Sequence, residues 1–117
     1  MEQEVHIVYK LSASASTEGD ISIYQPPKGW DFVIEGISVA FPPESDFELE
    51  VSLYDGIRKI APTEGVFVGK GMSFSTSRKI RLEEGSAIIL HYKNNSSSST
   101  RIAVIEIVGL LESEKKL

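Results

Sequence analysis

Two acidic side chains, Glu48 and Glu50, have a spacing that permits chemistry. In a β-strand, residues i and i+2 point to the same face, about 7 Å apart. Two carboxylates can flank and hydrolyse a glycosidic bond when one has a raised pKa, and they can also bind calcium. However, both alternate with the apolar Phe47, Leu49 and Val51, a pattern that is equally typical of a solvated strand face. We favour this plainer interpretation.

The two histidines, His6 and His91, are the natural candidates for metal binding. Metal-dependent enzymes of the cupin type use a closely spaced His-x-His pair, a nearby Glu and a later His, and neither histidine here has such a neighbour. Cysteine is absent, which excludes disulfides, thiolate metal sites and cysteine nucleophiles. No Gly-x-Ser-x-Gly elbow accompanies the many serines. We predict a protein without enzymatic activity or cofactor, and keep a small cupin-like metal-dependent enzyme as the second alternative.

Three aromatic residues lie beside predicted turns. Tyr24 and Trp30 flank a Pro-Pro-Lys-Gly turn, and Tyr54 precedes an Asp-Gly turn. Exposed rings at the edge of a β-sandwich bind sugars by stacking, while polar neighbours fix their orientation. Together with Glu48 and Glu50, the three rings form a candidate ligand-binding set. They support a carbohydrate-binding module as the first alternative, although for Trp30 we favour a place over the core.

Basic residues are concentrated in the middle of the chain, whereas the first half is acidic and the net charge is -5. This basic group could meet phosphates, sulfated sugars or an acidic region of a neighbouring subunit. It comprises Arg58, Lys59, Lys70, Arg78, Lys79 and Arg81. Nucleic-acid binding would require interleaved exposed aromatic residues, but the alternation around Phe67 and Phe74 predicts burial. We therefore rank nucleic-acid binding below charge pairing between subunits.

The candidate residues described above must be positioned by short segments in which apolar and polar residues alternate. Gly, Pro, Asn and Asp separate these segments. In the first segment, Val5, Ile7 and Tyr9 share one face, while His6 and Val8 share the other. No window has sustained helical periodicity. Strands are predicted at Val5–Leu11, Ile21–Tyr24, Phe32–Phe41, Phe47–Tyr54, Gly56–Ile60, Val66–Val68, Met72–Ser75, Lys79–Leu82, Ala87–Tyr92 and Arg101–Leu111. The fold class is therefore all-β, a two-sheet antiparallel β-sandwich, with a jelly roll favoured.

Length and composition fit one domain. The 117 residues are 41% hydrophobic and 25% charged, as in ordinary globular proteins. The longest apolar run, 103–111, is interrupted by Glu106 and is shorter than the roughly 20 residues of a membrane span. The acidic start is unlike an export signal, so we expect an intracellular protein or a virion component. We predict a single domain over 1–112 and a frayed, charged tail over 113–117.

Two predicted strands are apolar on both faces, which is unusual where one face meets water. Ile88 and Leu90 alternate with Ala87 and Ile89, and 102–108 shows the same pattern around Glu106. Either loops cover these strands, or a second subunit buries their outer face. We therefore predict a homo-oligomer that associates through an apolar sheet face, with a glycan or another protein as a further possible partner.

Three segments resemble a known class of proteins. The stretch 27–39 (PKGWDFVIEGISV) is similar to the opening of small jelly-roll domains in capsid, tail and receptor-binding proteins of viruses and bacteriophages. The hairpin 80–90 (IRLEEGSAIIL) and the final segment 105–112 (IEIVGLLE) resemble later parts of the same domains. The resemblance implies a virion-associated structural or adhesion module, with a trimer as the expected oligomer. It implies no individual functional residue.

Overall fold

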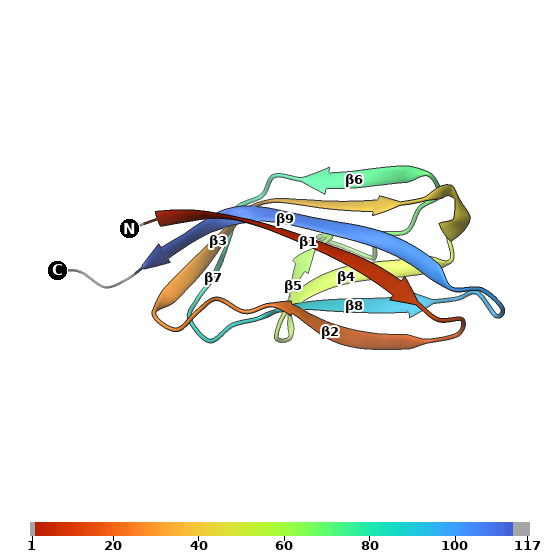
Figure 1. The fold of residues 1–117 in the computed structure, drawn as a ribbon, viewed down its shortest axis with the longest axis horizontal. Helices are drawn as coiled ribbons and strands as arrows, with labels where there is room; N and C mark the ends of the chain where they lie inside the picture. The colour runs from red at the N-terminus through yellow and green to blue at the C-terminus, as the bar shows by residue number, and fades with distance from the viewer. Residues whose placement is uncertain (1, 114–117) are drawn as a thin grey trace.

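The structure, a computed structural model, describes residues 2–113 and consists of two packed antiparallel β-sheets (Figure 1). One short 3-10 helix, η1 (Pro43–Ser45), interrupts the strands. The strands are β1 (Glu2–Ala13), β2 (Glu18–Tyr24), β3 (Trp30–Phe41), β4 (Leu49–Asp55), β5 (Arg58–Ala61), β6 (Met72–Thr76), β7 (Ile80–Leu82), β8 (Ile88–Asn94) and β9 (Arg101–Ser113). Among the described residues, no helix is long and apolar enough to cross a membrane.

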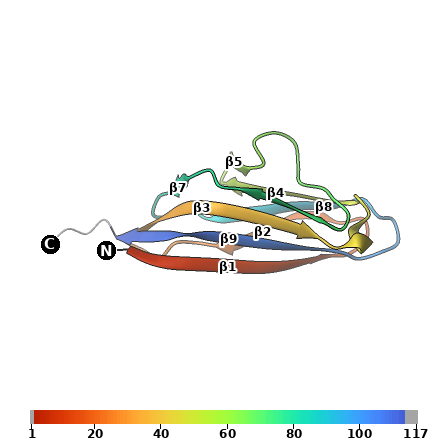
Figure 2. The same ribbon diagram turned by 90° about the horizontal axis from the view of Figure 1, so that it is seen from above.

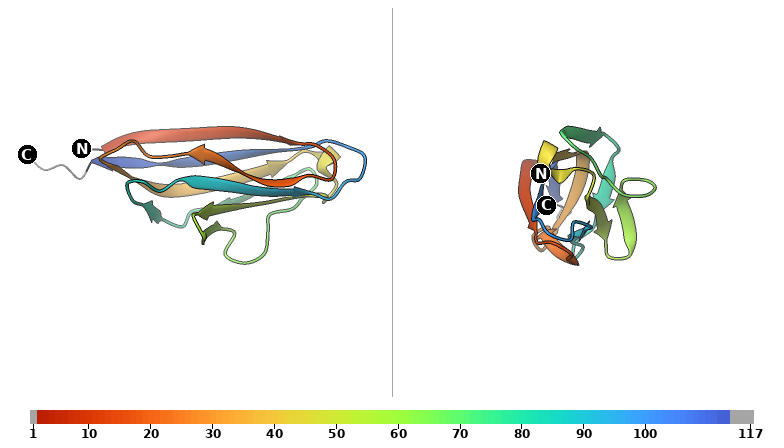
Figure 3. Two further views of the ribbon diagram at one scale, coloured as in Figure 1. Left: turned by 90° about the horizontal axis from the view of Figure 1, so that it is seen from below. Right: turned by 90° about the vertical axis from the view of Figure 1, so that its right-hand side faces the viewer.

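The strand order is that of a jelly roll. The large sheet has the order β1-β9-β3-β6, with β7 also paired to β3, and the small sheet has the order β2-β8-β4-β5. Both β6 and β7 run antiparallel to β3, so they act as two halves of one interrupted strand. Figure 2 shows the long strands β1, β9 and β3 side by side, and both views of Figure 3 show the small sheet packed against them. The predicted fold class is confirmed.

The core lies between the sheets and follows from the alternation of apolar residues along each strand. Fully buried side chains come from both layers, and each one of this size contributes about 1.5–3 kcal/mol relative to exposure. The largest are Phe32, Leu11, Ile34, Leu49, Leu53, Ile60, Leu82, Ile88, Leu90, Ile105, Ile107 and Val39. Phe67 and Phe74 pack partly buried against this core, as predicted.

One glycine makes the close packing of the large sheet possible. A Cβ atom on Gly109 in β9 would lie 2.4 Å from the carbonyl oxygen of Val33 and 2.8 Å from the ring of Phe32. Such distances are too short for any side chain. The hydrogen atom at Gly109 therefore leaves the space that the Phe32 ring occupies in the core.

The predicted strand Val66–Val68 is wrong. In this segment only Phe67 pairs, through an isolated antiparallel bridge to Val51 in β4, so one residue pair forms in place of a strand. The chain also continues further than expected at its end, since Ser113 pairs with Trp30 within the large sheet. The rest of the predicted frayed tail, 114–117, lies outside the described residues.

A buried amide joins the loops at one end of the sandwich. The side-chain Nδ2 of Asn94 donates to the carbonyl oxygens of Ala13, Ser14 and Ser99, at 3.0, 3.1 and 2.9 Å. Its Oδ1 accepts a hydrogen bond from the backbone N–H of Ser96. Asn94 is only 2% exposed, so these bonds tie the β1–β2 and β8–β9 loops together away from water.

Candidate functional site

The three aromatic residues predicted as ligand contacts do not gather at one place. Tyr24 packs its ring against Phe32, with the ring centres 5.0 Å apart, and burial raises the pKa of its hydroxyl. Trp30 is partly buried against the core, which agrees with the interpretation favoured from the sequence. Tyr54 alone of the three lines a surface depression.

The predicted acidic pair is held by neighbouring side chains. Glu48 Oε1 accepts hydrogen bonds from Nε and Nη2 of Arg101, at 3.0 and 2.6 Å. Glu50 Oε2 accepts a hydrogen bond of 2.9 Å from the side chain of Asn95. Both carboxylates therefore bind the region around the β8–β9 loop and help to fix it.

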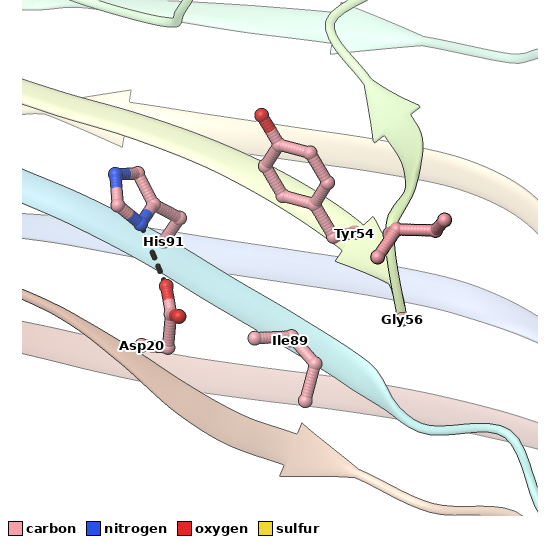
Figure 4. A pocket seen from close by; sticks show the side chains of 6 residues that line it. Asp20, Tyr54, Gly56, Ile89 and His91 are labelled. Atoms are coloured by element: carbon pink, nitrogen blue, oxygen red, sulfur yellow. Dashed lines mark hydrogen bonds and ion pairs between the residues drawn. The ribbon is translucent and has the colours of Figure 1, made fainter.

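The depression that contains Tyr54 lies on the outer side of the small sheet and has a volume of about 340 Å³ (Figure 4). Three adjacent strands supply its walls: β2, β8 and β4, together with the turn after β4. It is lined by Asp20, Tyr54, Gly56, Ile57, Ile89 and His91. We call it the His91 pocket.

Polar and apolar groups meet in the His91 pocket. The strand register sets Asp20 directly opposite His91, and His91 Nδ1 lies 2.6 Å from Asp20 Oδ1. His91 Nε2 lies 3.3 Å from a carboxylate oxygen of Glu18. The ring of Tyr54 stands edge-on to the imidazole, with centres 6.4 Å apart. Sugar-binding sites combine an aromatic ring and apolar surface with several hydrogen-bonding groups. Tyr54, Ile89 and the polar side chains supply these features here.

Metal chemistry receives no support from the part of the chain that the structure describes. Within residues 2–113, no group of three or more His, Asp or Glu side chains is placed to hold a metal ion. His6 lies on β1 of the large sheet, next to Glu106 at 3.8 Å, whereas His91 lies on β8 of the small sheet. The two histidines therefore belong to separate surfaces.

The outward side of the large sheet is a second candidate surface, which we call the β9 face. It consists of the side chains of β1, β9 and β3 that point away from the core. Val8 and Val108 are 59% and 43% exposed, and His6 lies 3.8 Å from Glu106 on the same face. The other apolar members, all half-buried, are Val33, Ala40, Ile102, Val104 and Leu110.

The basic residues of the middle segment mostly bind groups of their own chain. Arg58 pairs with Asp55 at 2.8 Å, and Lys70 pairs with Asp46 at 3.4 Å. Arg78 donates to the carbonyl oxygen of Ile60, and Lys59 donates to that of Gly65. These side chains therefore have partners within one chain, and their pairing with a neighbouring subunit stays a prediction.

Arg81 joins three strands at the end of the sandwich opposite Asn94. It binds Asp31 at 3.0 Å and Glu112 at 2.7 Å. Arg81 in β7 therefore links the start of β3 to the end of β9. The hydrogen bond that it donates to Glu112 is the largest of the effects that raise the pKa of Arg81 above its usual range. Asp31, only 3% exposed, also accepts a hydrogen bond from the backbone N–H of Glu84.

Comparison with known proteins extends the description of the fold. No family model matches the sequence, and no curated protein matches it. A chain from the acid-stable capsid of Helicobacter pylori bacteriophage KHP30 matches with a TM-score of 0.56 and 13% identity, over 99% of this chain and 100% of that chain. At this identity the likeness concerns the fold, and it confirms the resemblance to virus-capsid jelly rolls that the sequence indicated.

Two further structures match at lower scores. A chain of the cyanophage Pam1 capsid matches with a TM-score of 0.48 and 13% identity, over 94% of this chain and 84% of that chain. A chain from the disulfide-linked pili of Bacillus endospore appendages also has a TM-score of 0.48, with 15% identity, over 95% of this chain and 89% of that chain. Scores below 0.5 leave the fold assignment resting on the KHP30 match and on the strand order.

Proposed function

We propose that this chain is a non-enzymatic structural module that self-associates in a virion or a comparable particle. The observation that carries the proposal is the β9 face, where Val8 and Val108 expose apolar surface on a sheet of long, regular strands. Burying the exposed Val8 and Val108 removes apolar area from water, which favours association. The similarity to a phage capsid chain of the same extent supports an assembly role.

The proposed assembly contact uses the β9 face of each copy, and three copies is the number that the resemblance to viral jelly rolls implies. Val108 lies at the middle of this face, opposite His6 on β1 and Gly36 on β3. A charge at Val108 would be buried without a partner in the assembled state. It would remain solvated in the separated chain, so association is expected to weaken much more than folding.

The test is the solution mass by light scattering. Wild type is expected to be oligomeric, and Val108→Glu is expected to have a smaller mass, because it loses the β9-face contact, with unchanged circular dichroism. Ile57→Glu is the matched control, because Ile57 is fully exposed but lies in the turn after β4, beside the small sheet. A wild-type monomer, or a Val108→Glu protein with wild-type mass, would contradict the proposal.

A second candidate function is carbohydrate binding, in an adhesion role, at the His91 pocket. Here Tyr54 offers a ring for stacking, while Asp20 and His91 offer groups that can hydrogen-bond to sugar hydroxyls (Figure 4). The pocket is open to solvent at the surface of the small sheet, so it stays accessible when the β9 face is covered. The ligand set predicted from the sequence is then reduced to Tyr54 and gains Asp20 and His91.

A glycan array tests this candidate. Binding by the wild type should be lost with Tyr54→Ala and with His91→Ala, while Trp30→Ala should keep its binding pattern because Trp30 lies away from the pocket. Loss with Trp30→Ala alone would instead favour the turn region at which the sequence pointed. A folded wild type that binds no glycan on a broad array would contradict carbohydrate binding.

A further inference from the structure

The four sheet edges of the molecule differ in how well they resist pairing with another strand. Edge strands expose unpaired N–H and C=O groups, and proteins commonly blunt them with short strands, bulges or a covering segment. In the small sheet, β5 has 4 residues and β2 contains a register shift between Ser22 and Tyr24. In the large sheet, β6 and β7 share one edge in pieces of 5 and 3 residues.

The remaining edge, β1, has none of these features. It is 12 residues long and pairs with β9 without a register shift from Glu2 to Ala13. It contains no proline. Within residues 2–113, no other strand pairs with β1, so its second edge is available along nearly its whole length. An edge of this kind is a template for adding another strand.

The charges on β1 are arranged so that the strand is complementary to an inverted copy of itself. Glu4 and Lys10 both point away from the core, and both are exposed. Neither has an ion-pair partner among the described residues. In an antiparallel pair centred on Ile7, Glu4 of each copy would lie directly opposite Lys10 of the other. Two opposite-charge pairs then form, and no like charges face each other.

The inward side of β1 fits the same register. In a pair centred on Ile7, Val5 would face Tyr9 of the other copy and Ile7 would face Ile7. These three side chains are only partly buried in the single chain, although they pack against the core. A pair centred on His6 would be shorter and would place two histidines opposite each other, so the register centred on Ile7 is preferred.

We propose that two copies of this chain pair through antiparallel β1 strands, centred on Ile7, and so join their large sheets into one continuous sheet. The inference rests on the proposed self-association and adds to it a second contact with two-fold symmetry. This pair uses the backbone edge of β1 and leaves Val108, at the middle of the β9 face, open. Two contacts of different symmetry on one module would allow assemblies larger than either contact alone produces.

The test uses reversal of charge. Glu4→Lys places two lysine side chains opposite each other, and Lys10→Glu places two glutamates opposite each other, so each variant should weaken the β1 contact about tenfold. The double variant restores both opposite-charge pairs and should recover the wild-type dissociation constant. An equimolar mixture of the two single variants should form a mixed pair more tightly than either forms alone. Sedimentation equilibrium measures all four, and circular dichroism checks folding.

To separate this contact from the β9 face, the charge variants are also made in the Val108→Glu background, which lacks the proposed face contact. Dimers of Val108→Glu that respond to charge reversal and its restoration would support the β1 pair. Self-association that responds to Val108→Glu but not to either charge variant would overturn the β1 pair and leave the proposed function standing. A wild type that is monomeric at the highest soluble concentration would overturn both, and leave the edge open to a strand from another protein.

Discussion

The two antiparallel sheets of this sandwich have very different outer surfaces. On the large sheet, the centre of the β9 face carries exposed Val8 and Val108 beside the ion pair of His6 with Glu106. On the small sheet, Asp20 and His91 meet at the surface, beside Glu18. Covering Val8 and Val108 would remove apolar surface from water, whereas covering Asp20 and His91 would desolvate charged groups. This contrast supports the proposal that the large sheet makes contacts between proteins and that the small sheet binds polar ligands.

The largest expected effect on stability comes from comparing two glycines, one in each sheet. Gly109→Ala is expected to lower the free energy of unfolding by about 3 kcal/mol, because its Cβ would collide with backbone and with the Phe32 ring in the large sheet. Gly19→Ala in the small sheet should cost less than about 1 kcal/mol, since its Cβ would meet only the hydroxyl end of Tyr92, at 3.2 Å. Urea unfolding measures both. Equal decreases in the free energy of unfolding for the two variants would mean that the two sheets are packed equally tightly.

A smaller effect is expected from two buried serines. Ser45 Oγ, 2.7 Å from the carbonyl oxygen of Ile102, stabilises the large sheet through a hydrogen bond. Ser52 Oγ, on the small sheet, is buried and has no hydrogen-bond partner among the described residues. Ser45→Ala should therefore lower the free energy of unfolding by about 1 kcal/mol, whereas Ser52→Ala should raise it by a similar amount. Thermal unfolding of both variants checks the signs, and a loss on Ser52→Ala would point to a role for that hydroxyl.

The smallest expected effect concerns pH and Tyr24, at the edge of the small sheet. Burial raises the pKa of its hydroxyl above the ordinary value of 10.0, so the folded chain holds this proton more tightly than the unfolded chain does. The resulting stability is complete below pH 10.0 and is lost as the pH rises through the raised pKa. Tyr24→Phe should lose less stability than wild type between pH 8 and about pH 11. Parallel alkaline losses in the two proteins would contradict this.

Alternation along the chain was sufficient to predict the sandwich, because the face to which a side chain points depends only on its place in its own strand. Val5, Ile7 and Tyr9 were assigned to one face of their strand in this way, and all three pack against the core. The segment around Phe67 has the same alternation, but it forms only one bridge, to Val51 in β4. Alternation of apolar residues predicts which side chains are buried. It does not by itself predict a strand, because a strand also needs a neighbouring backbone with which to form hydrogen bonds.

The His91 pocket could not be predicted because its key contact joins residues 71 positions apart. Asp20 and His91 meet only through the register of β2 against β8, which no local pattern encodes. The same reason explains Arg81, whose partners Asp31 and Glu112 come from distant strands. Trp30 and Tyr24 were considered for ligand binding because they flank a turn. Neighbouring turns do not determine whether a ring turns outward or, as Tyr24 does, towards Phe32.

The buried amide of Asn94 also determines how this protein ages chemically. Hydrolysis of the amide would replace the donor of three hydrogen bonds by a carboxylate oxygen facing three carbonyl oxygens, in a place without water. The usual route to this damage requires the backbone nitrogen of Asn95 to attack the Asn94 side chain. In the folded chain that N–H donates to the carbonyl oxygen of Glu48, at 2.8 Å. Because burial and this hydrogen bond hold both groups in place, the fold is expected to slow the loss of the amide that joins its loops.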